Sequence, residues 1–340
     1  MYHLVFPLLL SFFQGQVPES SQPAAISTDD LVKLEADQIS AAVLEFVESD
    51  AAKLKLYVSS DGRIRLYSDS RSREVKDIFK LSEAMLNKLD ATLGVMPAAE
   101  GESAELLGLV INSPATYFDL CDVVAKAAES QARFMQASKN VTGFSIFAPE
   151  LTVYFHEASF QEEARIDHSI AHSLIHLELH RRYGEIPLWI REGIATALED
   201  MTVGQVYGPW YLNGFVFSSS HAEWRGVQTQ KQVARLKDFR RIFSYPANPY
   251  DDHLAHEAFA FALYSLLEEP QGLAQMLKGM QEVYAETNPE GGRFLMTVEQ
   301  TTELLEASFE TGFLERFQTW WVKPPIWKQK SKKSKKSKKE

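Results

Sequence analysis

The most informative part of the sequence is AHSLIH at residues 171–176, followed by WIREGIA at residues 189–195. Residues four apart lie on the same face of a helix, separated by about 40° around its axis. His172 and His176 can therefore bind one metal ion if this segment is helical. Zinc requires a third protein ligand, and Glu192 in the second segment is the candidate.

The residues around the two histidines favour a helix. The segment 164–183 contains neither proline nor glycine, and its apolar residues recur at helical spacing. Gly184 follows as a stop signal, and Pro187 marks the start of a second helix that is expected to run to about Asp200. The histidines and Glu192 thus belong to two successive helices.

The complete pattern, with PLWIREGIA at residues 187–195, resembles the zinc motif of the gluzincin metallopeptidases. It is most similar to a secreted bacterial branch, in which HExxH is followed by P-x-W-x-x-E-G-x-A. The specific match covers residues 164–200. The resemblance implies a zincin-like fold and a zinc ion held by His172, His176 and Glu192.

The sequence departs from the family at the position after the first histidine. The family has a glutamate there, which acts as the general base that takes a proton from the attacking water. Ser173 occupies this position, and a hydroxyl cannot accept that proton at neutral pH. We therefore expect a zinc-binding pseudopeptidase that binds peptides or proteins. An active zinc hydrolase with a relocated base and a metal-free structural or interaction protein are the alternatives.

Several acidic residues near the motif are candidates for other roles. Glu199 lies two helical turns after Glu192 and is expected to orient a ligand histidine. A relocated base would have to come from Glu178, Glu185, Glu199 or another histidine. Glu178 lies about 240° around the helix from His172 and is expected to face away from the metal.

Four further histidines have two possible interpretations each. His168 and His180 continue the four-residue spacing, as surface or helix-end residues, or as an alternative ligand or proton shuttle. The helix face rotates by about 120° between them, so the whole series cannot face one ion. The resemblance implies that a later helix supplies an oxyanion-stabilising residue. His253 and His256 are the candidates, with solvated helix-start positions as the alternative.

The order of the predicted elements indicates an α+β fold. Residues 21–50 are expected to form a linker and an N-terminal helix, residues 51–205 a zincin-like lobe with a mixed sheet and the motif helices, and residues 206–325 an all-α lobe. Strands are predicted at 54–58, 64–66, 107–111, 143–147 and 151–156, and helices at 31–48, 75–93, 115–138, 229–243, 251–268, 271–286, 297–307 and 310–321. The resemblance implies that strand 143–147 or 151–156 pairs with an extended substrate.

Composition and the chain ends narrow the functional classes. The 340 residues are 45% hydrophobic with a net charge of −11, which argues against specific nucleic-acid binding. Residues 1–20 contain the apolar run LVFPLLLSFF and are interpreted as a signal peptide, which predicts a secreted or periplasmic protein. Residues 326–340 are predicted to be a disordered Lys-rich tail that can contact anionic surfaces. Cys121 is the only cysteine, so no intrachain disulfide can form.

Overall fold

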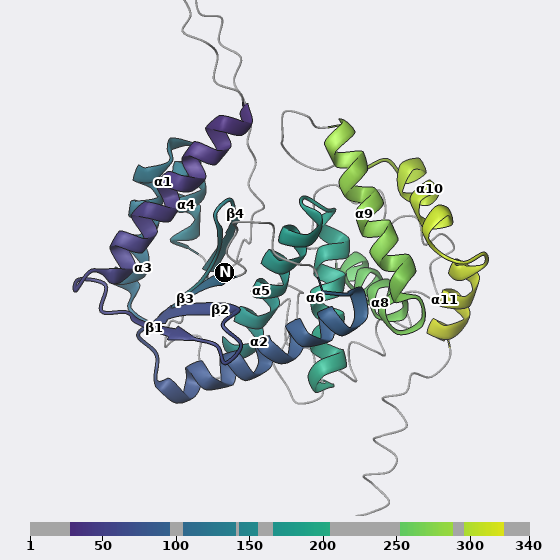
Figure 1. Ribbon diagram of the computed structural model, residues 1–340, viewed down its shortest axis with the longest axis horizontal. Helices are drawn as coiled ribbons and strands as arrows, with labels where there is room; N and C mark the ends of the chain where they lie inside the picture. The colour runs from purple at the N-terminus through teal and green to yellow at the C-terminus, as the bar shows by residue number, and fades with distance from the viewer. Residues whose placement is uncertain are drawn as a thin grey trace, which may run out of the picture. The chain divides into compact units, whose positions relative to one another are not determined.

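The computed structural model describes residues 28–95, 105–140, 143–155, 166–204, 252–287 and 296–322. Contacts within the chain divide it into two compact units. The first comprises residues 1–75, 104–162 and 285–294, and the second comprises residues 76–103, 163–284 and 295–340. The sheet belongs to the first unit and the two motif helices to the second (Figure 1). The predicted lobe of residues 51–205 is therefore distributed over both units.

The sheet of the first unit is mixed and has the strand order β1-β2-β3-β5-β4. Its strands are β1 (Lys55–Val58), β2 (Ile64–Ser68), β3 (Leu106–Ile111), β4 (Gly143–Phe147) and β5 (Glu150–Phe155). The three inner strands β2, β3 and β5 are parallel, whereas each edge strand is antiparallel to its neighbour. The predicted strands and the predicted combination of helices with a mixed sheet are confirmed.

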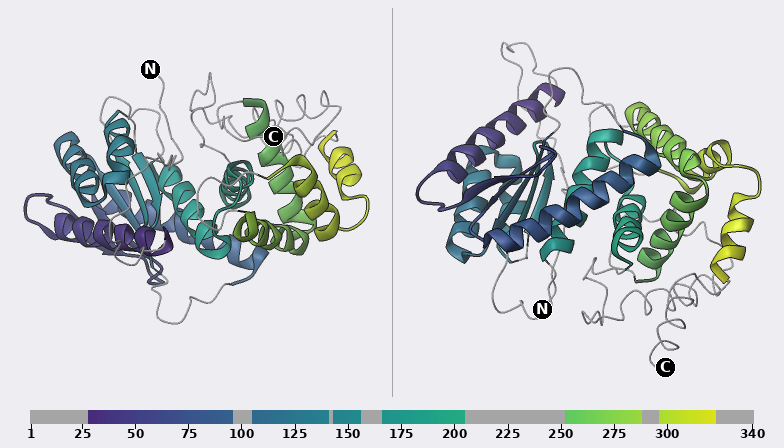
Figure 2. Two further views of the ribbon diagram at one scale, coloured as in Figure 1. Left: turned by 90° about the horizontal axis from the view of Figure 1, so that it is seen from above. Right: turned by 60° about the horizontal axis from the view of Figure 1, so that its bottom comes forward.

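Three helices of the first unit supply the core that covers the sheet. They are α1 (Thr28–Glu48), α3 (Pro114–Ala127) and α4 (Ala132–Ser138), which lie together on one side of the strands in Figure 2. Ile39 and Val43 of α1 and Leu120 of α3 are buried in one apolar cluster with strand residues such as Leu109 and Val153. Apolar burial of this kind is the main force that holds the unit together.

The single helix predicted over residues 115–138 is wrong in one respect, because the structure interrupts it. Ala128 has an extended backbone (φ −141°, ψ 114°), and a short 3₁₀ turn, η1 (Glu129–Gln131), leads into α4. Ala128 is buried, and the break lets α4 pack against α3. Neither proline nor glycine marks this position, so the helical periodicity continues across the break.

The described secondary structure of the second unit is entirely helical. Its helices are α2 (Ser72–Leu93, whose first residues belong to the first unit), α5 (Ile166–Tyr183), α6 (Leu188–Val203), α8 (Asp252–Glu268), α9 (Pro270–Thr287), α10 (Val298–Ser308) and α11 (Phe313–Val322). Phe261 of α8 is fully buried, and its ring lies edge-on to Trp189 of α6 and to Phe313 and Phe317 of α11. The predicted helices at 164–183, 251–268, 271–286, 297–307 and 310–321 are confirmed within a few residues.

Some predicted features lie outside the described residues: the signal peptide, the helix at 229–243 and the Lys-rich tail. Within the described part of the chain, no helix is long and apolar enough to cross a membrane.

Candidate metal centre

Helix α5 presents three histidines along one face. Ile170, Leu174 and Leu177 are completely buried and anchor the helix in the second unit. The helix ends at Gly184, where a positive φ of 63° reverses the chain and the amide donates to the carbonyl of His180 (2.6 Å). His168, His172 and His176 follow one another at intervals of four residues, so their side chains succeed one another along the helix.

Helix α6 presents two glutamates to those histidines. Glu192 and Glu199 are seven residues apart, which places them about 20° apart around the helix, one above the other. The residue after Glu192 must be glycine, because a Cβ atom on Gly193 would lie 2.5 Å from the carbonyl oxygen of Ala258 on α8. The backbone next to Glu192 is therefore packed directly against α8.

His172, His176 and Glu192 come together into one cluster. One potential ligand atom from each lies within 4.8 Å of the others. Nε2 of His172 is 3.1 Å from Oε2 of Glu192, and Nε2 of His176 is 3.7 Å from the same oxygen. The two imidazole rings are 4.6 Å apart between centroids. Both nitrogens thus converge on one carboxylate oxygen, as they would around a shared cation.

The contacts continue beyond this cluster into the interior. Nδ1 of His172 is 2.9 Å from Oε1 of Glu199, whose other oxygen, Oε2, is 3.1 Å from Nδ1 of His168. Glu199 is completely buried and His168 is only 3% exposed. The result is a continuous series in which imidazole and carboxylate alternate: His168, Glu199, His172, Glu192 and His176.

Burial and charge pairing compete within this series. Burial lowers the pKa of His172, but the hydrogen bonds with Glu192 and Glu199 outweigh burial and raise the pKa to about 9. Burial lowers the pKa of His176, and the charge of His172 contributes to the same effect. Burial raises the pKa of each glutamate, but the neighbouring histidines outweigh it and lower both pKa values. At neutral pH, both carboxylates and the His172 imidazolium are therefore charged, and the His176 imidazole is neutral.

These residues fit a divalent cation. Within the described part of the chain, no group lies within hydrogen-bonding distance of the buried Nε2 of His176. Unpaired buried polar atoms are uncommon, and this one points to a missing partner. Two carboxylates would balance the charge of a dication once both imidazoles are neutral. The side chains of His172, His176 and Glu192 are 10%, 13% and 12% exposed, although Nε2 of His176 itself is buried.

The other predicted site residues are placed as follows. Ser173 is half-buried on α5, next to His172 in sequence. His253 and His256 lie in the first turns of α8, but their side chains are outside the described part of the structure. Glu185 forms an ion pair with Arg191, in which Oε2 of Glu185 is 3.8 Å from Nη1 of Arg191.

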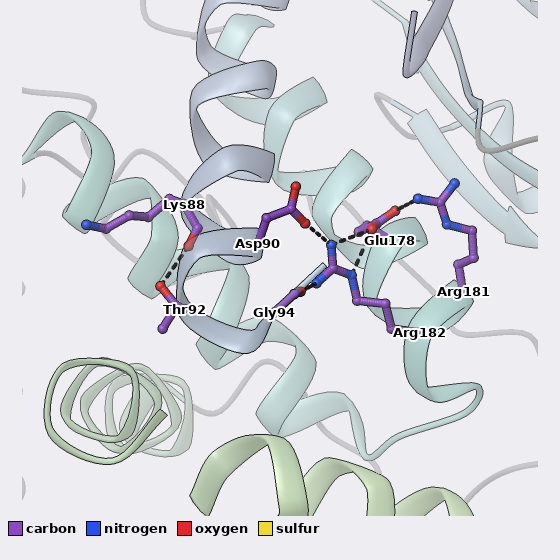
Figure 3. A network of polar contacts seen from close by, with 7 residues as sticks. All are labelled: Lys88, Asp90, Thr92, Gly94, Glu178, Arg181 and Arg182. Atoms are coloured by element: carbon purple, nitrogen blue, oxygen red, sulfur yellow. Dashed lines mark hydrogen bonds and ion pairs between the residues drawn. The ribbon is translucent and has the colours of Figure 1, made fainter. Parts of the chain in front are cut away.

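Glu178, one candidate for a relocated base, is instead bound in an ion-pair network (Figure 3). Its carboxylate accepts hydrogen bonds from Arg181 and from Nε of Arg182 (2.8 Å). Arg182 also pairs with Asp90 and donates to the carbonyl oxygen of Gly94 (2.7 Å), at the end of α2. This network joins α2 to α5 within the second unit.

The contact between His168 and Glu199 was not anticipated from the sequence. His168 was expected on the helix surface or as an alternative ligand or proton shuttle, and the structure buries it against Glu199. The regular spacing of the histidines marked the residue, but its partner lies 31 positions away on another helix.

Comparison of the sequence with protein-family models finds no match, and comparison with curated proteins finds no significant similarity.

Proposed function

We propose that this chain binds a divalent metal ion, zinc, through His172, His176 and Glu192, and that it is impaired as a peptidase. The convergence of these three side chains within 4.8 Å carries the proposal. Two imidazoles and one carboxylate form a typical donor set for zinc, with a position left for a further ligand. The resemblance of residues 164–200 to the gluzincin motif points to the same ion.

A zinc ion in such a site supplies Lewis-acid polarisation of a carbonyl group. Efficient hydrolysis also needs a base near the reacting water, which contributes about 10²–10⁴-fold to the rate. Ser173 cannot serve as that base, and the carboxylate of Glu178 is hydrogen-bonded to two arginines, Arg181 and Arg182. Glu199 is held by His168 and His172. Recognition of a peptide or protein without efficient cleavage is the function that these residues support best.

Metal binding is tested by elemental analysis of untagged protein. We expect one zinc per chain in the wild type, and none in His176→Ala or His172→Ala. The matched control is His180→Ala, one turn further along α5, which should retain the ion. Zinc retained by His176→Ala but lost from His180→Ala would place the ion elsewhere and overturn the assignment.

The carboxylate ligand is tested in the same way. Glu192→Gln keeps the volume and removes the charge, so zinc affinity should fall by at least about 100-fold, beyond the range for residues that only orient ligands. Glu185→Gln is the matched control, because Glu185 is partly exposed and pairs with Arg191 rather than with the histidines. Equal affinities in the two variants would exclude Glu192 as a ligand.

The impaired chemistry is tested by assays on casein and peptide libraries with added zinc. Wild-type turnover should not exceed that of His176→Ala. Ser173→Glu should increase turnover, and Ser173→Gln, of the same size but without a base, should not. Wild-type turnover typical of a zinc peptidase, abolished in His172→Ala, would instead favour an active hydrolase.

A further inference from the structure

His168 lies outside the three-residue ligand set, yet it is bonded into the same buried series. Its Nδ1 is 3.1 Å from Oε2 of Glu199, and Oε1 of Glu199 is 2.9 Å from Nδ1 of His172. Both carboxylate oxygens are therefore engaged by histidines of α5. His168 is therefore linked through Glu199 to His172, one of the three proposed ligands.

Burial makes the contact with His168 important for the orientation of Glu199. The Glu199 side chain is 0% exposed, so its two oxygens depend on protein groups rather than on bulk water for their hydrogen bonds. A carboxylate that loses one of its hydrogen bonds is less restricted in its rotation about its terminal bond, because that torsion is broad. Hydrogen bonds at both oxygens fix the plane of the carboxylate and, with it, the direction from which it contacts His172.

The orientation of His172 in turn determines which nitrogen faces the cluster. With Nδ1 engaged by Glu199, Nε2 is directed at Glu192, 3.1 Å away. A carboxylate that holds the far nitrogen of a ligand histidine fixes the ring and its tautomer, and loss of such a partner typically weakens metal binding by about 10–100-fold. A ring free to turn would present Nε2 to the ion less of the time.

We propose that His168 is a positioning residue of the metal centre, which acts through Glu199 to hold the His172 ring with Nε2 directed at the ion. The inference rests on the proposed function, because it assigns His168 a role only if His172 is a ligand. It differs from a purely structural role, in which His168 would stabilise the fold without changing the affinity or geometry of the site.

Three substitutions at position 168 separate these roles. His168→Leu removes the donor and keeps an apolar side chain of similar length. His168→Asn places an amide nitrogen near the position of Nδ1 and should restore the contact. His168→Gln carries the same amide one methylene further out and is the matched control. For each variant, the zinc dissociation constant, the visible spectrum of the Co²⁺ form and the melting temperature of the metal-free protein are measured.

We expect His168→Leu to bind zinc about 10-fold more weakly, at the lower end of the range for ligand-orienting residues, and to alter the Co²⁺ spectrum. His168→Asn should recover both properties more fully than His168→Gln. If wild-type protein binds zinc and His168→Leu matches it in affinity and spectrum, the inference is wrong and the proposed function stands.

Two other outcomes are also decisive. If His168→Leu does not fold, the comparison of Asn with Gln decides, and equal affinity in those two variants overturns the positioning role. Wild-type protein that binds neither zinc nor Co²⁺ overturns the proposed function and this inference together.

Discussion

At the scale of single residues, a carboxylate engages each ring nitrogen of His172. Nδ1 contacts Glu199 and Nε2 contacts Glu192. These contacts raise the pKa of His172 to about 9, so in the metal-free protein at neutral pH the ring is an imidazolium with a proton on each nitrogen. One of these protons is on Nε2, the nitrogen that we propose as the metal ligand.

Metal binding should therefore release a proton. At pH 7.5 we expect about one proton per bound zinc, since the ion must displace the proton of His172. Titration calorimetry in two buffers with different ionisation enthalpies measures this number directly. His172→Gln should lose both the binding and the release, and zinc binding without proton release by wild-type protein would contradict the assigned ligand.

The raised pKa of His172 also predicts how pH changes the stability of the metal-free protein and the additional stability that zinc provides. A folded pKa of about 9, above the ordinary value near 6.5, stabilises the metal-free protein below pH 6.5, and this stabilisation is lost as the pH rises to 9. The contribution of bound zinc grows over that interval because fewer protons compete. Melting temperatures from pH 6.5 to 9 should show the difference between the two forms widening, and a constant difference would exclude the linkage.

The sequence alone identified the three proposed ligands but not the series behind them. Spacing of four on α5 and the glutamate of the next helix were enough to bring His172, His176 and Glu192 together as candidates. The burial of His168 could not be predicted, because it depends on how α6 packs against α5. Such packing between helices is set by many distant apolar side chains rather than by the motif itself.

At the scale of elements, Gly193 shows how the motif is coupled to its surroundings. A Cβ atom there would meet the backbone oxygen of Ala258 at 2.5 Å, which would push α6 away from α8. We expect Gly193→Ala to destabilise the protein by about 1–3 kcal/mol through overpacking, and to weaken zinc binding because Glu192 is the adjacent residue. Chemical denaturation and zinc titration measure the two effects.

Gly279 on α9 is the matched control for Gly193. Its Cβ position is also 2.5 Å from a neighbour, but that atom is the tip of the flexible Leu304 side chain. In addition, alanine is about 1 kcal/mol more favourable than glycine in the interior of a helix. Gly279→Ala should therefore cost less stability and leave zinc affinity unchanged, and equal losses in the two variants would count against the close backbone approach.

The network between α2 and α5 in Figure 3 permits a further prediction. The side chains of Arg182 and Glu178 are each 1% exposed. Arg182→Met should cost about 3 kcal/mol, the low end of the range for breaking a buried ion pair, because the Glu178 carboxylate loses Arg182 but keeps its contact with Arg181. Replacing Glu178 by Met as well should recover most of that loss. Urea unfolding measures both, and a double variant as unstable as the two single changes added together would contradict the pairing.

The surface pair of Arg65 and Glu105 is the control for this network. Their side chains are 34% and 41% exposed. Arg65→Met should therefore change stability by less than about 1 kcal/mol, as is usual for exposed ion pairs.

At this scale, the sequence predicts the end of a helix only where a local stop signal such as glycine is present. Three described helices, α2, α5 and α6, are followed by a glycine with positive φ (Gly94, Gly184 and Gly204), and the predicted ends of α2 and α5 were accurate. The break at Ala128 carries no such signal, because it follows from the packing of α4 on α3. The positions of the strands could also be predicted from the sequence. The parallel pairing of β2, β3 and β5 could not, because it depends on contacts between residues far apart in the chain.

At the scale of the whole molecule, the candidate metal centre belongs entirely to the second unit. All five residues of its series lie in residues 163–284, whereas the sheet lies in the first unit. A ligand that binds only the folded state stabilises the part of the protein that it holds together. Zinc should therefore slow amide hydrogen exchange in α5 and α6 and leave β3 and β5 nearly unchanged. Equal slowing in both would show that the two units open as one.

The alternating series of histidines and glutamates is supplied entirely by residues 168–199, two successive helices joined by a short turn. Closing so short a loop has a small entropic cost, and local contacts of this kind form early in folding. The ligands can therefore meet before α8, which begins at Asp252, has reached its place beside α6. Zinc added to the unfolded chain should accelerate refolding as well as slow unfolding. The ion would then act as a template during synthesis, when only the α5–α6 hairpin has emerged.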